Sequence, residues 1–185
     1  GSAVGGVTSD ATANTVGGTN AGNSLTSNNS DNSLFGHSAG YTLSTGDGNV
    51  ALGSAALYSN NSDQNIAIGH RAAYSLTGAA NVAIGHDAMR NAVGKDRGVC
   101  IGWQAGFDGG TSQSVLIGYG AGDNLDTGYN NTAVGDSALG NGQSNIKCVA
   151  IGWESQAVAT ANGTTSVGYE SLRQATSNYN VGLGY

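Results

Sequence analysis

Aromatic side chains recur along this chain at two fixed distances from a repeated glycine, and they are its strongest candidates for binding chemistry. Aromatic rings bind the faces of sugars by stacking, and Trp and Tyr are also favoured where proteins contact one another. The pattern therefore leaves two roles open, contact with a receptor or packing between subunits. The first set follows the glycine by one residue and the second by five: Trp103, Tyr119, Trp153, Tyr169 and Tyr185, and then Tyr41, Tyr58, Tyr74 and Phe107.

Two pairs of polar side chains occupy equivalent positions in successive repeats. His70 and His86 each follow the glycine directly and are potential metal ligands, but no Cys or carboxylate shares their column, so we expect no metal. Glu154 and Glu170 follow it by two, and stacking would place their carboxylates about 5 Å apart, as in a retaining glycosidase. Stacking gives this distance to any adjacent pair, so we expect neither catalytic residues nor a cofactor.

The remaining polar residues indicate structure rather than chemistry. Arg71 and Asp87 share a column in successive repeats and predict an ion pair at the surface. Asp123 and Asp126 lack the Gly-Gly-x-Gly-x-Asp spacing of calcium-binding β-rolls, and no glycine-rich stretch continues into the Gly-Lys-Ser/Thr of a nucleotide loop. The sequence therefore predicts a structural or binding protein and not an enzyme.

The glycine that organises all these columns closes a motif of the form Asn-Val-Ala-Ile-Gly, which recurs every 16 to 18 residues. So regular a step predicts one structural unit stacked on itself, which is a solenoid. The glycine itself is expected to form a turn with positive φ. The predicted turn glycines of the central repeats are Gly36, Gly53, Gly69, Gly85, Gly102, Gly118, Gly135, Gly152 and Gly168.

The residues before the glycine alternate in the manner of a short strand. The third and first residues before it are mostly Val, Ile or Leu, and the residue between them is mostly small and most often Ala. A unit of this length holds no helix long enough to pack, so we predict an all-β, parallel β-solenoid of about eleven coils. Asn recurs four residues before the glycine and predicts a ladder of amide hydrogen bonds from coil to coil.

The large apolar residues of one coil are few, and this predicts an oligomer. Each coil offers one Val, one Ile and in some cases a Leu such as Leu57 or Leu139, which make a thin core. We therefore expect the small-residue columns, for example Ala51 and Ala67, to pack against other chains.

Charge and composition exclude two classes of partner. The net charge is −6 and no basic patch exists, so we expect no nucleic acid. No stretch approaches 18 consecutive apolar residues, so we expect no membrane insertion. Cys100 and Cys148 are three coils apart, too far for an intrachain disulfide, which predicts free thiols and favours folding in a reducing cytosol.

The repeats divide the chain simply. Residues 1–13 are predicted to be an irregular segment that leads into the array, and residues 14–185 a single β-solenoid domain. Because the chain stops one residue past a motif glycine, we expect it to be a fragment of a longer protein.

Individual repeats resemble those of two related groups of proteins. Residues 65–69 and 81–85 resemble the motifs of both groups, and the first group is the head domain of trimeric autotransporter adhesins, which is a left-handed parallel β-roll. Residues 49–57 and 131–139 resemble the shaft repeats of bacteriophage tail fibres, with the form Asn-Thr-Ala-Val-Gly-x-x-Ala-Leu. The coils are longer than is usual in adhesin heads and the chain contains cysteine, and both features favour the fibre.

The resemblance implies a left-handed coil and a homotrimer. It also implies a structural and receptor-binding segment of a tail fibre, assembled in the host cytoplasm and carried on the virion. Such a fibre would attach to a bacterial cell-surface glycan or outer-membrane protein. The alternative that the resemblance leaves open is a secreted adhesin head at the bacterial cell surface.

Overall fold

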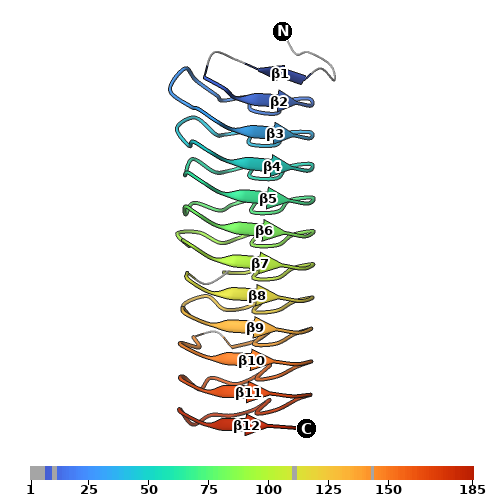
Figure 1. Ribbon diagram of the computed structural model, residues 1–185, viewed down its shortest axis with the longest axis vertical. Helices are drawn as coiled ribbons and strands as arrows, with labels where there is room; N and C mark the ends of the chain where they lie inside the picture. The colour runs from blue at the N-terminus through green and yellow to red at the C-terminus, as the bar shows by residue number, and fades with distance from the viewer. Residues whose placement is uncertain (1–6, 10–11, 110–111, 143) are drawn as a thin grey trace.

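The computed structural model describes residues 7–9, 12–109, 112–142 and 144–185, and these form a rod of stacked coils (Figure 1). The strands form one sheet in which each lies beside the next strand of the sequence, from β1 to β12. The strands are β1 (Val7–Ser9), β2 (Thr15–Gly17), β3 (Ser33–Phe35), β4 (Val50–Leu52), β5 (Ile66–Ile68), β6 (Val82–Ile84), β7 (Val99–Ile101), β8 (Val115–Ile117), β9 (Thr132–Val134), β10 (Val149–Ile151), β11 (Thr165–Val167) and β12 (Val181–Leu183).

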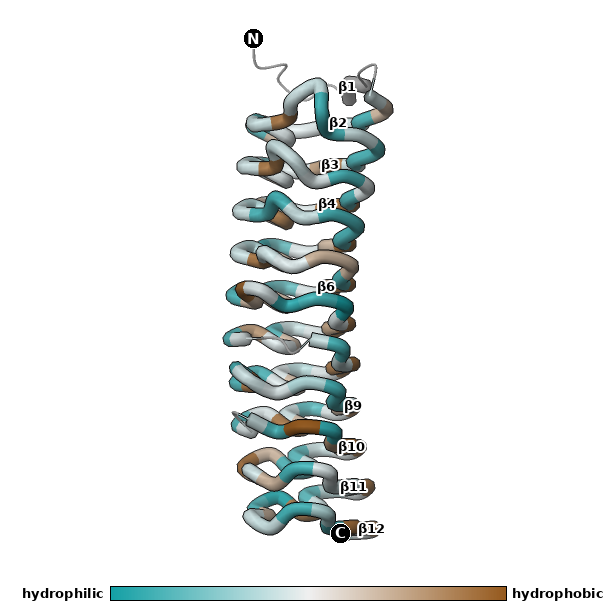
Figure 2. The backbone as a smooth tube through the Cα atoms, turned by 90° about the vertical axis from the view of Figure 1, so that its left-hand side faces the viewer, coloured by the Kyte–Doolittle hydropathy of each residue, from teal (hydrophilic) through white to brown (hydrophobic). Residues whose placement is uncertain are grey.

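Strands β2 to β12 are parallel, and their register follows the motif. Val50 of β4 lies opposite Ile66 of β5, and Leu52 lies opposite Ile68. After a quarter turn, the coils lie one below another without interruption (Figure 2). The predicted parallel β-solenoid is confirmed, because each repeat contributes one strand in the same register. The left hand that the resemblance implies stays a prediction.

The first strand was not predicted. β1 runs antiparallel to β2, with Val7 opposite Gly17 and Ser9 opposite Thr15. β1 lacks the repeat motif. An antiparallel partner needs only the free edge of β2, so the repeat pattern did not indicate it. The predicted irregular segment 1–13 therefore contains one strand, while residues 1–6 and 10–11 lie outside the described residues.

The inner and outer faces of the strands are the reverse of what we expected. The middle residue of each strand from β3 to β11 is buried, and Ala51 and Ala67 are fully so. The flanking residues point outward, and Leu52 is 50% and Ile66 37% exposed. The expectation that small columns pack against other chains was therefore wrong. A coil of 16 to 18 residues that closes on itself has room for few large side chains, so the inward strand position is small in most coils, while Val and Ile lie outside.

In neighbouring coils the core is filled by large and small residues at complementary positions. Where the middle of the strand is Leu34, the residue six further on is Gly40, and a β-carbon there would lie 2.9 Å from Leu34 Cδ1. In the next coil the order is reversed to Ala51 and Leu57, both fully buried. In these two coils the two positions therefore share one space, which holds one large side chain.

The motif glycines adopt the backbone that the sequence predicted. Gly85 has φ of 136°, and a β-carbon there would lie 2.2 Å from the carbonyl oxygen of Gly102. Consecutive coils thus approach through backbone atoms alone at this corner. The corner also places non-glycine residues in the left-handed region, including Asp87 at φ of 58° and Leu57 at φ of 50°. No residue type marks these positions, so the sequence did not predict them.

The predicted amide ladder is confirmed in the interior. The Oδ1 atom of Asn65 accepts hydrogen bonds from the backbone N–H of Asn81 at 2.9 Å and from its side-chain amide at 3.1 Å. Asn49 Oδ1 accepts from the backbone N–H of Asn65 at 2.9 Å, and Asn81 Oδ1 accepts from the backbone N–H of Gly98 at 2.8 Å. The ladder satisfies buried N–H groups that the short strands leave unpaired.

Both cysteines are free, as predicted, and both are buried. Burial raises the pKa of the Cys100 thiol far above its ordinary range, which disfavours the reactive thiolate. Cys148 takes a position in the asparagine column, where its Sγ atom lies 3.2 Å from the carbonyl oxygen of Ala161. The two thiols therefore fill space in the core.

Candidate functional site

The broadest candidate surface is the outer face of the sheet, made by the first and third residues of β2 to β12. We call it the outer apolar face. None of these positions holds a charged residue, and most hold Val, Ile or Leu. Hydrophobic residues, brown in Figure 2, recur along the strand side of the rod. Monomeric proteins rarely expose an apolar surface of this extent. Its most exposed members are Leu52, Ile66, Val115, Ile117, Ile151, Val167, Val181 and Leu183.

The predicted aromatic residues after the glycine form a stacked column beside this face. Trp153 and Tyr169 are parallel with ring centroids 4.8 Å apart, and Tyr169 and Tyr185 are 5.2 Å apart. Trp103 and Tyr119 meet edge to face at 5.6 Å. Their exposed fractions are large, at 53% for Trp103 and 51% for Tyr119. We call this set the first aromatic column.

The second predicted set is also stacked. The rings of Tyr41, Tyr58 and Tyr74 are nearly parallel in succession, with centroids 4.9 and 4.8 Å apart. The Arg90 guanidinium then lies 5.8 Å from the Tyr74 ring and 5.5 Å from Phe107, so the column continues through a cation. The sequence did not predict this role of Arg90, although its position five residues after a motif glycine was a signal that could have shown it.

Stacking limits what the rings can offer to a ligand. A ring between two parallel rings, such as Tyr58 or Tyr169, presents only its edge to solvent. A sugar can stack only on an exposed ring face, and the edge-to-face arrangement leaves more of Trp103 and Tyr119 open than the parallel stacks do. Receptor contact and packing between subunits both stay predictions, and the best-placed rings for the former are Trp103 and Tyr119.

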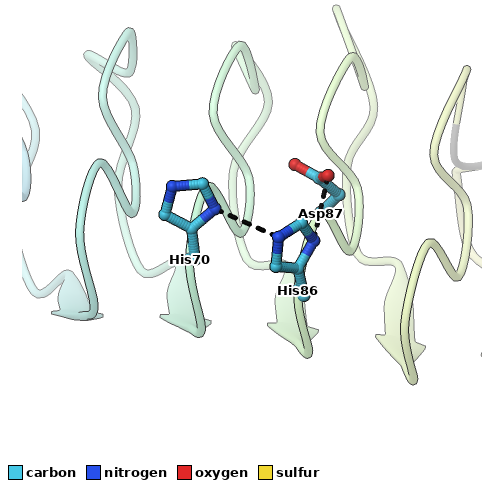
Figure 3. Close-up of side chains that lie close together, drawn as sticks. All are labelled: His70, His86 and Asp87. Carbon is cyan, nitrogen blue, oxygen red and sulfur yellow. Dashed lines mark hydrogen bonds and ion pairs between the residues drawn. The ribbon is translucent and has the colours of Figure 1, made fainter.

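A polar cluster lies where two coils meet at the start of the first aromatic column (Figure 3). His70 Nδ1 lies 3.3 Å from His86 Nε2, and His86 Nδ1 lies 3.0 Å from Asp87 Oδ2. The side chain of Asp87 is only 4% exposed, while both histidines are exposed. We expected no carboxylate beside the histidines. Their own column contains none, but Asp87 of the next column lies beside His86.

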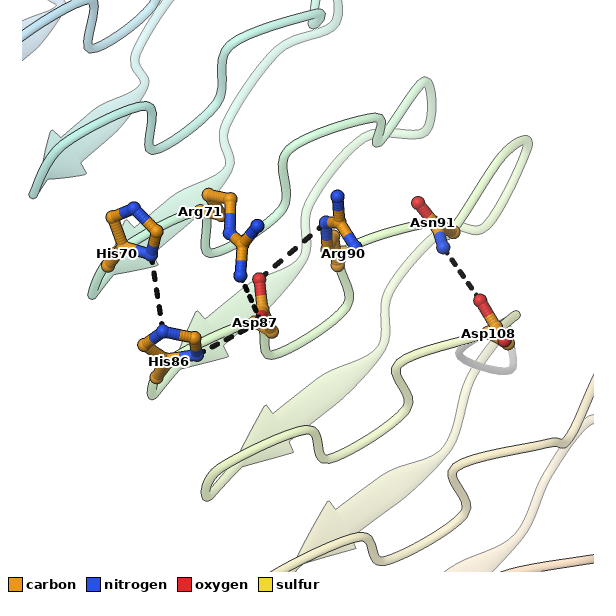
Figure 4. Close-up of polar contacts among 7 residues, drawn as sticks. All are labelled: His70, Arg71, His86, Asp87, Arg90, Asn91 and Asp108. Atoms are coloured by element: carbon orange, nitrogen blue, oxygen red, sulfur yellow. Dashed lines mark hydrogen bonds and ion pairs between the residues drawn. The ribbon is translucent and has the colours of Figure 1, made fainter.

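Two arginines hold the buried carboxylate of this cluster (Figure 4). Arg71 donates to Asp87 Oδ2 at 2.8 Å, and Arg90 Nε lies 3.6 Å from Asp87 Oδ1. The predicted pair of Arg71 and Asp87 is therefore confirmed, but it belongs to a larger network and its carboxylate is buried. Within the described residues, His70, His86 and Asp87 are the one group of at least three His, Cys, Asp or Glu side chains close enough to share a metal ion.

One of the two stacked glutamates is engaged in an ion pair. Glu154 Oε2 lies 2.6 Å from Arg173 Nε. A nucleophile needs an open path to its substrate, and a carboxylate oxygen paired to Arg does not have one.

A groove of about 530 Å³ lies on the side of the return loops and was not predicted. Asp108 and Asp126 line it, and Asp108 accepts a hydrogen bond from Asn91 at 2.6 Å (Figure 4). Nearby, burial and the charge of Asp108 raise the pKa of Asp123 to about 6. The groove is polar and acidic.

Asp123 predicts a specific pH dependence of stability. Its pKa is about 6 in the folded chain and about 3.8 when unperturbed, so the ionised carboxylate destabilises the fold increasingly as the pH rises through this range. Asp123→Asn is expected to increase the free energy of unfolding by roughly 1 kcal/mol at about pH 8, allowing for its partial exposure, and by much less at about pH 4. Melting temperatures at the two pH values, with Asp31→Asn as an exposed control, measure this. An equal effect of Asp123→Asn at both would contradict it.

Comparison with known proteins found no match. No family model, no curated protein and no solved structure matches the chain. The fold and the surfaces described above are therefore the basis for assigning a function. Among the described residues, no helix has the length and apolarity needed to cross a bilayer.

Proposed function

We propose that this chain is a structural and receptor-binding segment of a homotrimeric bacteriophage or phage-like tail fibre that attaches to a bacterial surface. The observation that carries the proposal is the outer apolar face. It runs along the whole parallel sheet, holds no charge, and exposes residues such as Leu52 and Ile151 that a solitary rod would place in water. Burying this face between identical chains would stabilise each of them in proportion to the apolar area removed.

The shape of the chain suits this role mechanically. Ten intervals between eleven coils at about 4.8 Å give a rod roughly 48 Å long. The coils are joined by parallel strands, by the amide ladder and by stacked rings, so neighbouring coils cannot move independently. Three parallel rods would present three copies of each surface site, and a weak contact repeated three times gains apparent affinity without any new interaction.

The contact surface for a receptor is proposed to include Trp103 and Tyr119 of the first aromatic column, which are 53% and 51% exposed and whose rings meet edge to face. A bacterial cell-surface glycan or outer-membrane protein would meet these rings beside the outer apolar face. The same architecture would serve the head of a trimeric adhesin, and the longer coils favour the fibre.

The proposal predicts an oligomer that one charge can dissociate. Light scattering on the purified chain is expected to give a mass near three times 18.3 kDa. Ile117→Lys places a charge within the outer apolar face and is expected to yield monomers with an unchanged circular dichroism spectrum. Val93→Lys is the matched control, because Val93 is 63% exposed but lies in a return loop outside the face. A monomeric wild type, or trimers in both variants, would contradict the trimeric fibre.

A further inference from the structure

We propose that His70 and His86 form a binding site for a divalent transition metal of the zinc or copper type, through His70 Nδ1 and His86 Nε2. The site lies within one chain and does not depend on the function proposed above. It rests on the separation of the two nitrogens, on the carboxylate behind His86 and on the absence of any other hydrogen bond shown to these two atoms in the described structure (Figure 3).

The distance between the nitrogens fits a shared ion. Two imidazole nitrogens bound to one Zn²⁺ at about 2.0–2.1 Å with a tetrahedral angle of about 109° lie about 3.3–3.4 Å apart. His70 Nδ1 and His86 Nε2 are 3.3 Å apart, and the rings are tilted by 36° with centroids 4.9 Å apart. The same separation is long for an N–H···N hydrogen bond, so it suits a bridging metal ion better than a hydrogen bond.

Asp87 prepares His86 as a ligand. His86 Nδ1 lies 3.0 Å from Asp87 Oδ2, so Nδ1 carries the hydrogen and donates it to the carboxylate. This leaves a lone pair on Nε2, which faces His70. A carboxylate that binds the far nitrogen of a ligating histidine fixes its orientation and raises its basicity.

Because two arginines already pair with its carboxylate, Asp87 is assigned as a positioning residue and not as a metal ligand. Its Oδ2 atom is shared between Arg71 and His86, and Arg90 approaches Oδ1, so its charge is already offset (Figure 4). Two histidines then bind the metal, and water or an external ligand completes the coordination. The positive charges of Arg71 and Arg90 oppose cation binding, so moderate rather than tight affinity is expected.

The donor atoms define the class of metal. Imidazole nitrogens suit Zn²⁺, Cu²⁺ and Ni²⁺, and Cu²⁺ binds most tightly in this series. Ca²⁺ and Mg²⁺ prefer oxygen ligands, and the pair offers none. Both histidines are exposed, so an ion reaches them without a change of the fold.

The test is calorimetric titration of the whole purified chain with Zn²⁺ alone, and then with Mg²⁺. One Zn²⁺ per chain is expected, with no binding of Mg²⁺. His70→Ala and His86→Ala should each weaken Zn²⁺ binding at least about tenfold. His37→Ala is the matched control, because His37 occupies the same column but Ser54 stands between it and His70. Circular dichroism confirms that each variant is folded.

Asp87→Asn separates positioning from ligation. It keeps a side-chain oxygen facing His86 but removes the carboxylate, and is expected to weaken Zn²⁺ binding about tenfold, the lower end of the effect of such outer partners. The proposal is overturned if the wild type binds no Zn²⁺, or if His70→Ala and His86→Ala bind it as tightly as His37→Ala does. A stoichiometry of one ion per three chains would overturn the intrachain site.

Discussion

Gly85→Ala is expected to destabilise the solenoid by more than about 3 kcal/mol, a large effect for a single methyl group. The added β-carbon would lie 2.2 Å from the carbonyl oxygen of Gly102 and 2.6 Å from its carbonyl carbon. Both atoms are backbone, so no side chain can rotate away and the coils themselves must separate. The residue would also have to hold φ of 136°, which L residues rarely adopt.

The matched control is Gly94→Ala. Gly94 also has positive φ, 67°, but a β-carbon there meets nothing within 4 Å. Its cost is that of the left-handed backbone alone, about 1 kcal/mol. Thermal melts of both variants followed by circular dichroism compare the two, and Gly85→Ala should melt well below Gly94→Ala. Equal melting temperatures would mean that the corner of the coil is more yielding than the close approach of Gly85 and Gly102 indicates.

The second large effect concerns how each coil fills its core. Leu34→Ala removes a fully buried side chain and is expected to cost about 2–5 kcal/mol. Gly40→Leu overfills the same space, because a β-carbon at Gly40 would lie 2.9 Å from Leu34 Cδ1, and is expected to cost about 1–3 kcal/mol. The double variant reproduces the order of the next coil, Ala51 and Leu57, and should be more stable than the sum of the single effects predicts.

The measurement is a double-mutant cycle from urea unfolding. A favourable coupling of at least about 1 kcal/mol between positions 34 and 40 is expected, since each change provides what the other needs. The left-handed backbone at position 40 tolerates leucine, because Leu57 has φ of 50° at the equivalent place and Gly40 has 59°. Leu34→Ala combined with Gly94→Ala serves as the uncoupled control. Additive costs at positions 34 and 40 would show that the two side chains do not share a space.

The sequence predicted some contacts of the candidate surfaces and not others. Equal spacing from the glycine was enough to predict that Trp153 and Tyr169 align, since parallel coils in register place equivalent residues one rung apart. Asp87 could not be connected to His70 in this way, because the two occupy different columns. The contact depends on the direction of the side chain at a left-handed residue, which spacing does not give.

Arg90 shows the same limit. Its column was known to be aromatic, yet the arginine lies between Tyr74 and Phe107 and also reaches Asp87. It therefore links the second aromatic column to the His–Asp cluster. Only the tertiary structure could show that one side chain serves both, since the reach of a flexible side chain is set by its neighbours and not by its place in a repeat.

The sequence by itself determined the period, the position of each motif strand, the glycine corner, the amide ladder and the free thiols. These features depend on residue type and spacing within one repeat, and stacking copies them along the rod. The tertiary structure alone decided which strand face is inward, placed β1 against β2, and paired Leu34 with Gly40. Alternation reveals that a strand has two faces, but the packing inside the closed coil selects the face that is buried. In the coil of β4 the interior is filled by Ala51 and Leu57, and Leu52 is left outside.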